Sequence, residues 1–231
     1  MADAAQRLED IRARIATAAV RAGRDPSDIV LLAVSKTIPA EAIAELFALG
    51  QPSFAESRQQ EADAKLPSVP SGIDWHFIGH LQRNKVRKVL ESFGTLHGID
   101  SLRLAQHVSS VAGELGLRPD LYLEVNLAAE PSKHGFDPDV LRAAIVELAQ
   151  LPNIQIRGLM GIPPEEKSPE AARRWFADLR KLRDDLALQS GAALAGLSMG
   201  MSGDFQIAIE EGSTIVRIGS ALFGKRSYQE S

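Results

Sequence analysis

The stretch IVLLAVSKTIPAEAIAELFALGQPSFAE, residues 29–56, contains the unit from which the fold can be inferred. Its first part, 29–35, is an almost unbroken apolar run, as expected of a strand that is buried on both faces of a sheet. Residues 39–49 then follow a helical period, and 52–56 are again short and mostly apolar. A buried strand, a helix and a second buried strand in this order predict parallel strands joined by a crossover helix.

The same alternation continues along the chain. The strands are expected at 29–35, 52–56, 75–79, 95–99, 121–126, 154–160, 193–199 and 214–219. The helices between them are expected at 39–49, 57–65, 81–91, 101–115, 137–150, 168–189 and 203–211, with a last short one from Ser220. A further helix, with apolar residues at helical spacing from Leu8 to Ala19, precedes the first strand and ends near Gly23.

Strand and helix repeats of this number predict an α/β fold, a single (β/α)8 barrel of the TIM type with an additional N-terminal helix. We expect one domain over 1–231, because the two Pro-rich stretches, 66–72 and 161–169, are too short to be linkers. A doubly wound open sheet is the alternative, since the sequence does not show whether the sheet closes.

The composition of the 231-residue chain restricts its function. The chain is 45% hydrophobic, has no apolar run long enough to span a membrane and begins with a charged segment unlike a signal peptide, so we expect a cytoplasmic protein without a membrane partner. The absence of cysteine excludes disulfides and thiolate chemistry. A net charge of −4 argues against nucleic acid as a partner.

One basic run and five histidines are further candidates for binding sites. The run 83–88 is predicted to be the solvated face of an amphipathic helix, with an RNA-binding surface as the minor alternative. The histidines show no metal-binding motif, and His76 and His80 flank a strand end rather than sharing a helix face. We therefore expect no metal site.

Two loops late in the chain are candidates for an anion site. LSMGMSGDF, 197–205, and RIGSALFG, 217–224, bring small residues and hydroxyls to strand ends that each open a helix. Backbone N–H groups in such loops can face a phosphate, and barrels of this type commonly bind phosphate after their seventh and eighth strands. The alternative is that the glycines only satisfy tight turns, and the loops by themselves do not decide between the two.

Lys36 stands where the first buried strand ends. An amine at a partly buried strand end loses hydration, which favours its neutral form, and a neutral amine is the nucleophile that captures an aldehyde. The simpler explanation is a lysine that reaches past the strand end to solvent. An aldehyde-reactive lysine together with an anion site is the pair of features that pyridoxal phosphate requires.

Four segments carry a resemblance to a known family. They are AVSKTIP (33–39), WHFIGHLQRNK (75–85), GLMGIP (158–163) and LSMGMSGDFQIAIEEGSTIVRIGSALFG (197–224). Together they resemble the pyridoxal phosphate homeostasis (YggS/PROSC) family, which is itself similar to the barrel domain of alanine racemase. The resemblance covers about residues 5 to 226.

The resemblance implies a protein that holds pyridoxal 5′-phosphate without catalysis. In such a protein Lys36 would carry the cofactor as a Schiff base, the internal aldimine, and Arg217 would face the pyridine nitrogen. The phosphate would be held by Ser198, Met199, Gly219 and Ser220. The family further implies a monomer that acts in cofactor homeostasis and amino-acid balance, with pyridoxal-phosphate-dependent apoenzymes as possible recipients.

Two residue positions bear on the chemistry that the resemblance implies. A guanidinium at Arg217 stays protonated, so the pyridine nitrogen would remain unprotonated and the cofactor would be a weaker electron sink. Ser57 stands where the family usually has asparagine, and its shorter hydroxyl reaches less far toward the phenolic oxygen of the cofactor.

An amino-acid racemase is the alternative function. Racemases of this fold use a second base on the opposite face of the cofactor, often a tyrosine. The only tyrosines here are Tyr122, early in a predicted strand, and Tyr228, close to the C-terminus. Neither is an evident second base, which favours the carrier.

Overall fold

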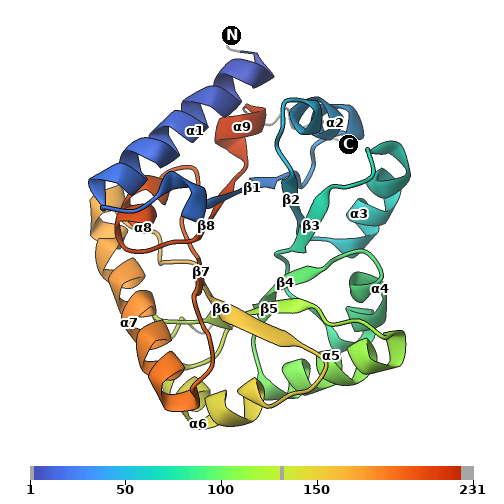
Figure 1. The fold of residues 1–231 in the computed structure, drawn as a ribbon, viewed down its shortest axis with the longest axis vertical. Helices are drawn as coiled ribbons and strands as arrows, with labels where there is room; N and C mark the ends of the chain where they lie inside the picture. Colours follow the sequence, from blue (N-terminus) through green and yellow to red (C-terminus); the bar gives the residue numbers. More distant parts are fainter. Residues whose placement is uncertain (1–2, 131–132, 225–231) are drawn as a thin grey trace.

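Eight parallel strands close into a barrel in the order of the chain, β1 to β8, in the computed structural model, which describes residues 3–130 and 133–224. Figure 1 shows the barrel surrounded by its helices. The strands are β1 (Val30–Val34), β2 (Ser53–Glu56), β3 (Asp74–Phe77), β4 (Thr95–Ile99), β5 (Asp120–Val125), β6 (Gln155–Gly161), β7 (Gly196–Ser198) and β8 (Ile215–Ile218). Pairing of β8 with β1 closes the sheet, so the predicted barrel is confirmed and the open sheet is excluded.

A helix follows each strand. The helices are α1 (Ala4–Arg21), α2 (Ala40–Ala48), α3 (Gln59–Lys65), α4 (Val86–Leu90), α5 (Leu102–Leu115), α6 (Pro138–Ala149), α7 (Arg173–Ser190), α8 (Phe205–Glu210) and α9 (Ser220–Phe223). Because α8 and α9 are short, they leave the outside of the last strands poorly covered. The predicted N-terminal helix α1 fills this place and packs against both of them (Figure 1).

Local chemistry sets where several helices begin and end. Asp3 and Ser101 cap α1 and α5 by accepting hydrogen bonds from backbone N–H groups in the first turn. Gly116 and Gly191 end α5 and α7 in the left-handed region, with φ of 66° at both positions. These are the signals that make boundaries of long helices predictable from sequence.

The predicted helix 81–91 is shorter in the structure. Gln82 is extended, with φ −76° and ψ 138° and without a side-chain cap, a 3-10 turn covers Arg83–Lys85, and α4 begins only at Val86. The apolar residues of this segment are buried, whereas Arg83, Arg87 and Lys88 are exposed. The prediction of a solvated basic face is thus confirmed.

Among the described residues no helix is long and apolar enough to cross a membrane.

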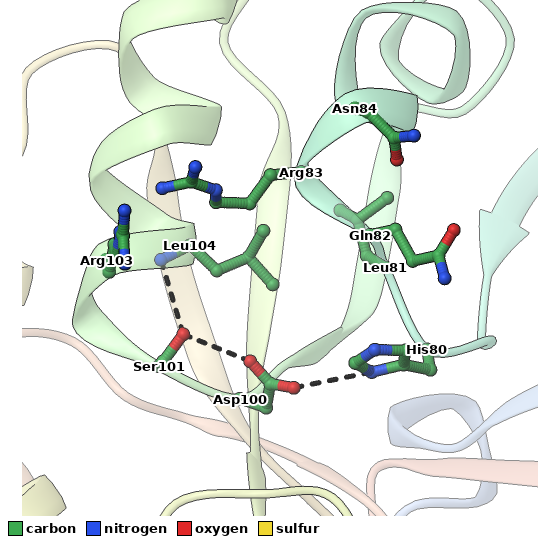
Figure 2. Close-up of a pocket in the computed structure, with 9 residues that line it drawn as sticks. All are labelled: His80, Leu81, Gln82, Arg83, Asn84, Asp100, Ser101, Arg103 and Leu104. Carbon is green, nitrogen blue, oxygen red and sulfur yellow. Dashed lines mark hydrogen bonds and ion pairs between the residues drawn. The ribbon is translucent and has the colours of Figure 1, made fainter.

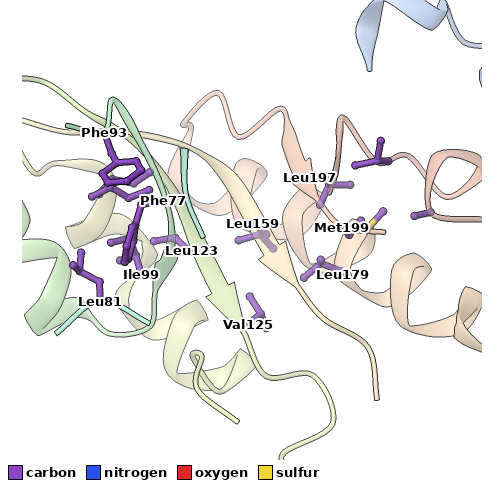
Figure 3. Close-up of a cluster of buried hydrophobic side chains, with 14 of the residues drawn as sticks. Phe77, Leu81, Phe93, Ile99, Leu123, Val125, Leu159, Leu179, Leu197 and Met199 are labelled. Atoms are coloured by element: carbon purple, nitrogen blue, oxygen red, sulfur yellow. The ribbon is translucent and has the colours of Figure 1, made fainter. Parts of the chain in front are cut away.

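Side chains that alternate along the strands separate two cores. Outward-facing residues of β3 to β7, such as Leu123, Leu159 and Leu197, pack against the helices in the large core drawn in part in Figure 3. A smaller cluster inside the barrel contains Leu32, Val34, Ala55, Tyr122, Met160 and Ile215. The barrel interior also buries polar side chains, His76, His97, Ser198 and Arg217, which are 0–5% exposed. Since buried polar groups need partners, these residues point to a functional interior rather than a purely apolar one.

Candidate functional site

A cavity of about 320 Å³ lies at the carboxyl end of the barrel strands, where predicted site residues meet. Its lining includes Lys36, Ser57, Arg217, Gly219 and Ser220, which come from the ends of β1, β2 and β8. Ile78, Met160 and Ile162 add apolar walls, and Met201, Ser202 and Gly203 complete the side after β7. The structure therefore brings five of the seven predicted cofactor-binding residues to one place.

Lys36 sits on a turn that is held on both sides. Ser35 donates its hydroxyl to the buried carboxylate of Glu56 at 2.7 Å, and its carbonyl accepts from Lys65 Nζ at 2.9 Å. On the other side Thr37 adopts the left-handed region, with φ 65°, and its backbone N–H donates to Glu61. A threonine in this region is strained, so the surrounding contacts must impose the turn, and they keep Lys36 at the cavity.

The anchor of this turn is a buried ion pair. Lys65 Nζ lies 2.9 Å from Glu56 Oε1 and 2.7 Å from Glu61 Oε1, and the Glu56 side chain is 0% exposed. Burial raises the pKa of Glu56, although its hydrogen bonds with Lys65 and Ser35 oppose this shift. The second oxygen of Glu56 has no hydrogen-bond partner among the described residues, so the carboxylate depends on its single engaged oxygen.

Arg217 lies at the base of the cavity and is fixed by three hydrogen bonds. Nη1 donates to the carbonyl and the hydroxyl of Ser198 at 2.6 and 2.8 Å, and Nη2 donates to the Gly161 carbonyl at 3.1 Å. Burial lowers the pKa of Arg217 to about 10, while the carboxylates of Glu124 and Asp204 act in the opposite direction. The side chain therefore remains a guanidinium near neutral pH. Its Nε–H and one Nη2–H have no protein acceptor among the described residues.

Ser198 and Met199 do not line the cavity. The Ser198 hydroxyl is buried between His97 and Arg217, at 2.8 Å from each. The backbone N–H of Met199 donates to the Ile215 carbonyl at 3.1 Å, and its side chain lies in the outer core. Their hydrogen-bonding groups are thus already engaged within the protein, which differs from the phosphate contacts that the resemblance implied for them.

The turn that follows β7 lines the cavity at the position expected for Ser198 and Met199. The backbone N–H groups of Ser202 and Gly203 make no hydrogen bond to the described residues, and the Ser202 hydroxyl adds a further donor. Gly200, with φ 93°, starts this turn where a Cβ would come within 2.6 Å of the Ala208 side chain. The sequence signal for Ser202 was the glycine pair 200 and 203 that encloses it.

The set of groups around the cavity fits pyridoxal phosphate. An amine is present that could take up the aldehyde, hydroxyls and free backbone N–H groups could hold the phosphate, and a guanidinium could meet the ring nitrogen, with apolar side chains available for the ring. The loop after β7 supplies two backbone N–H donors, those of Ser202 and Gly203, that make no hydrogen bond to the described residues. That surplus of donors is what an anionic ligand requires.

A larger cavity of about 530 Å³ lies elsewhere on the same rim and contains none of the predicted residues (Figure 2). In it His80 Nδ1 lies 3.3 Å from Asp100 Oδ2, and Arg83 and Arg103 stand above them (Figure 2). The ligand atoms of His80, Asp100 and His134 all lie within 4.8 Å of one another, so these residues could hold a metal ion. No sequence motif marks this cluster, because three separate loops contribute to it.

Comparison with known proteins agrees with this geometry. The family model described as alanine racemase, N-terminal domain, matches residues 7–227. A protein of Pseudomonas aeruginosa named pyridoxal phosphate homeostasis protein is 45% identical, with 99% of this chain and 98% of the relative covered. A relative of the same name from Aquifex aeolicus is 41% identical, with coverage of 98% and 100%.

Solved structures give the same result. PipY of Synechococcus elongatus PCC7942, solved with pyridoxal phosphate bound, is 42% identical, superposes with a TM-score of 0.86 and covers 96% of this chain and 100% of its own. Alanine racemase of Clostridium difficile 630 is 20% identical, with a TM-score of 0.68, covering 94% of this chain and 56% of its own. The second likeness shows a shared barrel fold only.

Proposed function

This chain belongs to the family of the pyridoxal phosphate homeostasis proteins, and from that premise we propose that it binds pyridoxal 5′-phosphate and holds it without catalysing a reaction of its own. The observation that carries the proposal is the single cavity that joins Lys36, Arg217 and the unpaired donors after β7. A relative at 42% identity has been solved with this cofactor bound, which supports the same ligand here.

Each side of the cavity has a separate task. Pyridoxal phosphate supplies an aldehyde that condenses with an amine and a ring that withdraws electrons. Lys36 Nζ would bond to the aldehyde carbon, with one water released as the carbon–nitrogen double bond forms. Ser202 and Ser220 would donate to the phosphate from one side, and Arg217 would donate to the ring nitrogen from the base of the cavity.

The test of this function is reduction with borohydride. Purified protein mixed with pyridoxal phosphate should turn yellow, and reduction should fix one pyridoxyl group that peptide mass mapping places on Lys36. A protein that stays colourless with excess cofactor, or that carries the label only on other lysines, would refute the proposal.

The hydrogen bond proposed between Ser202 and the phosphate gives a prediction for binding affinity. Replacing Ser202 by alanine removes a hydrogen bond to a charged group, so the preference for pyridoxal phosphate over pyridoxal should fall about tenfold, as expected for roughly 1.5 kcal/mol. The measurement is the ratio of the two dissociation constants by absorbance titration. Ser27→Ala, on the surface far from the cavity, is the control and should leave the ratio unchanged. An unaltered ratio in Ser202→Ala would show that the phosphate lies elsewhere.

An amino-acid racemase is the alternative, and Tyr122, the one tyrosine among the described residues, is not placed to act as its second base. Tyr122 is buried inside the barrel, where its ring stacks on His97 at 4.7 Å between centroids, and it is not part of the cavity lining. Burial raises the pKa of its hydroxyl to about 12, which makes proton removal harder. Tyr228 lies outside the described residues. Incubation of the loaded protein with single L-amino acids, followed by chiral chromatography, should yield no sustained formation of the D-enantiomer.

The proposal extends to the working form of the protein. We take residues 1–231 as one pyridoxal-phosphate-binding barrel domain, acting as a monomer in the cytoplasm and passing the cofactor to apoenzymes that depend on it. The continuous strand order of the barrel supports one domain, and the family to which the chain belongs supports the role in homeostasis. Size-exclusion chromatography with light scattering would test the monomer.

A further inference from the structure

A continuous chain of hydrogen-bonded side chains crosses the interior of the barrel. Asp74 Oδ2 lies 2.9 Å from His76 Nε2, and His76 Nδ1 lies 2.9 Å from His97 Nε2. His97 Nδ1 lies 2.8 Å from Ser198 Oγ, which accepts from Arg217 Nη1 at 2.8 Å. These residues belong to β3, β4, β7 and β8, so the chain connects opposite walls of the barrel.

The two ends of this chain lie in different surroundings. The side chain of Asp74, at the start of β3, is 55% exposed, and its Oδ2 also accepts from the Ser53 hydroxyl at 3.0 Å. His97 and Ser198 are fully buried. At the far end His97 and Arg217 both line the cavity assigned to the cofactor. The chain therefore links solvent at the amino end of the barrel to the base of the cavity at its carboxyl end.

The acceptor at one end determines where every proton lies. A carboxylate only accepts, so a His76 ring that carries one proton donates it from Nε2 to Asp74 and accepts at Nδ1. His97 then donates from Nε2 to His76, and its Nδ1 accepts from the Ser198 hydroxyl. A guanidinium only donates, and Ser198 Oγ accepts from it, so the direction deduced from Asp74 agrees with the requirement at Arg217.

The charges around the chain keep its centre neutral. Burial lowers the pKa of His97 strongly, and the charge of Arg217 acts in the same direction. The stacked Tyr122 ring is uncharged because burial raises the pKa of its hydroxyl to about 12. At the cavity end burial lowers the pKa of Arg217, and the carboxylates of Glu124 and Asp204 raise it. At the solvent end the hydrogen bond from His76 lowers the pKa of Asp74, so the carboxylate is charged over the neutral range.

We propose that Asp74, His76, His97 and Ser198 form a positioning relay that sets the hydrogen-bond direction at Ser198, the partner of Arg217, and transmits a change at the solvent end of the barrel to the cofactor cavity. If Asp74 no longer accepts, the His76 proton can move to Nδ1, His97 must then carry its proton on Nδ1, and Ser198 receives a donor in place of an acceptor. Ser198 Oγ would then accept from both His97 and Arg217, so its hydroxyl hydrogen would turn to another acceptor and its hydrogen bond with the guanidinium would change in strength. The part of this inference that concerns the cofactor rests on the function proposed above.

Two substitutions at Asp74 separate hydrogen-bond direction from charge. Asp74→Ala removes both the acceptor and the negative charge, whereas Asp74→Asn removes the charge but keeps an oxygen acceptor for His76. Because Asp74 is half exposed, both variants should fold. An electrostatic effect through space would be equal in the two, so a difference between them reports the relay.

The first measurement needs no cofactor. Nitrogen-15 NMR of the imidazole rings should show His76 and His97 with the proton on Nε2 in the parent protein and in Asp74→Asn, and a mixture of tautomers at His97 in Asp74→Ala. The second measurement is the pH titration of the visible band of the protein loaded with pyridoxal phosphate. Its midpoint in Asp74→Ala should differ from that in Asp74→Asn by roughly half a pH unit, about a threefold change in the equilibrium.

The outcomes distinguish this inference from the proposed function. Identical His97 tautomers in the two variants would overturn the relay, whatever the cofactor does. Altered tautomers with identical titration midpoints would overturn the transmission to the cavity. If Lys36 takes no label at all in the parent protein, the proposed function fails, while the NMR comparison still decides whether the relay exists.

Discussion

A Lys36→Ala variant is expected to lose the borohydride-stable pyridoxyl label entirely and to retain pyridoxal phosphate at least about 100-fold more weakly, which corresponds to about 2.7 kcal/mol. The phosphate donors after β7 and β8 remain, so weak noncovalent binding should persist without the absorbance band of the bond to the lysine. The fold should be unaffected, because Lys36 is half-buried at the cavity and is not part of either core.

The measurement combines absorbance titration with peptide mapping after reduction. Lys88→Ala, on the exposed face of α4, removes an equal charge and should behave as the parent protein does. A label of undiminished yield in Lys36→Ala would contradict the assignment of the covalent anchor. Circular dichroism of both variants confirms that they are compared in the folded state.

The second large effect is expected at Lys65, which supports the turn of Lys36 but does not line the cofactor cavity. A Lys65→Met variant leaves the fully buried Glu56 carboxylate without its cation, which should destabilise the fold by about 3–5 kcal/mol. Since small proteins have roughly 5–15 kcal/mol in total, this is a large fraction of the stability. The turn that carries Lys36 would lose its support at the Ser35 carbonyl at the same time, so labelling should also slow.

The pH dependence of this variant provides an internal check. Burial raises the pKa of Glu56 and Lys65 opposes that shift, so the folded-state pKa rises further when the lysine is removed. A carboxyl group with a raised folded-state pKa binds its proton more tightly in the folded protein, so the folded state gains stability as the pH falls toward that pKa. The deficit of Lys65→Met should therefore be smaller near pH 5 than near pH 8 in urea unfolding.

Lys181→Met is the matched control. Its ion pair with Asp178 spans 3.6 Å, and the side chains are 70% and 53% exposed, so its loss should cost less than about 1 kcal/mol. A Lys65→Met variant as stable as Lys181→Met, or a deficit that grows as the pH falls, would show that Glu56 is not held as the structure indicates.

Much of the fold and part of the site could be predicted because the signals are local. The apolar run 29–35 corresponds to β1 at Val30–Val34, and the strict alternation of strand and helix led to the barrel. The covering helix 101–115 was predicted closely because Ser101 and Gly116 mark its two ends. Helix 81–91 was predicted too long, since an apolar period does not show that Gln82 is extended and uncapped.

The candidate site was predicted less completely. Lys36 and Arg217 were predicted from a strand end and from a motif of the family, and the structure places both at the cavity. Ser202 was placed among the loop residues but not assigned to the phosphate, and Ser198 was assigned there, although it is buried against His97. Whether Ser198 or Ser202 is free to bind a ligand depends on which hydrogen-bonding groups already have partners in the protein. Hydrogen bonds between strands that are distant in the sequence determine those partners.

By itself the amino-acid sequence determined the order of the elements, the number of strand and helix repeats, and the lysine at the end of the first strand, because period, apolar runs and caps act within a few residues. Only the tertiary structure decided that Glu56 and Lys65 hold the turn of Lys36, and that residues as far apart as Asp74 and Arg217 belong to one hydrogen-bonded chain. Closing the barrel brings inward-facing side chains of non-adjacent strands within hydrogen-bond distance. His97 and Ser198, for example, are partners 101 positions apart, and such a pair leaves no periodic signal in the chain.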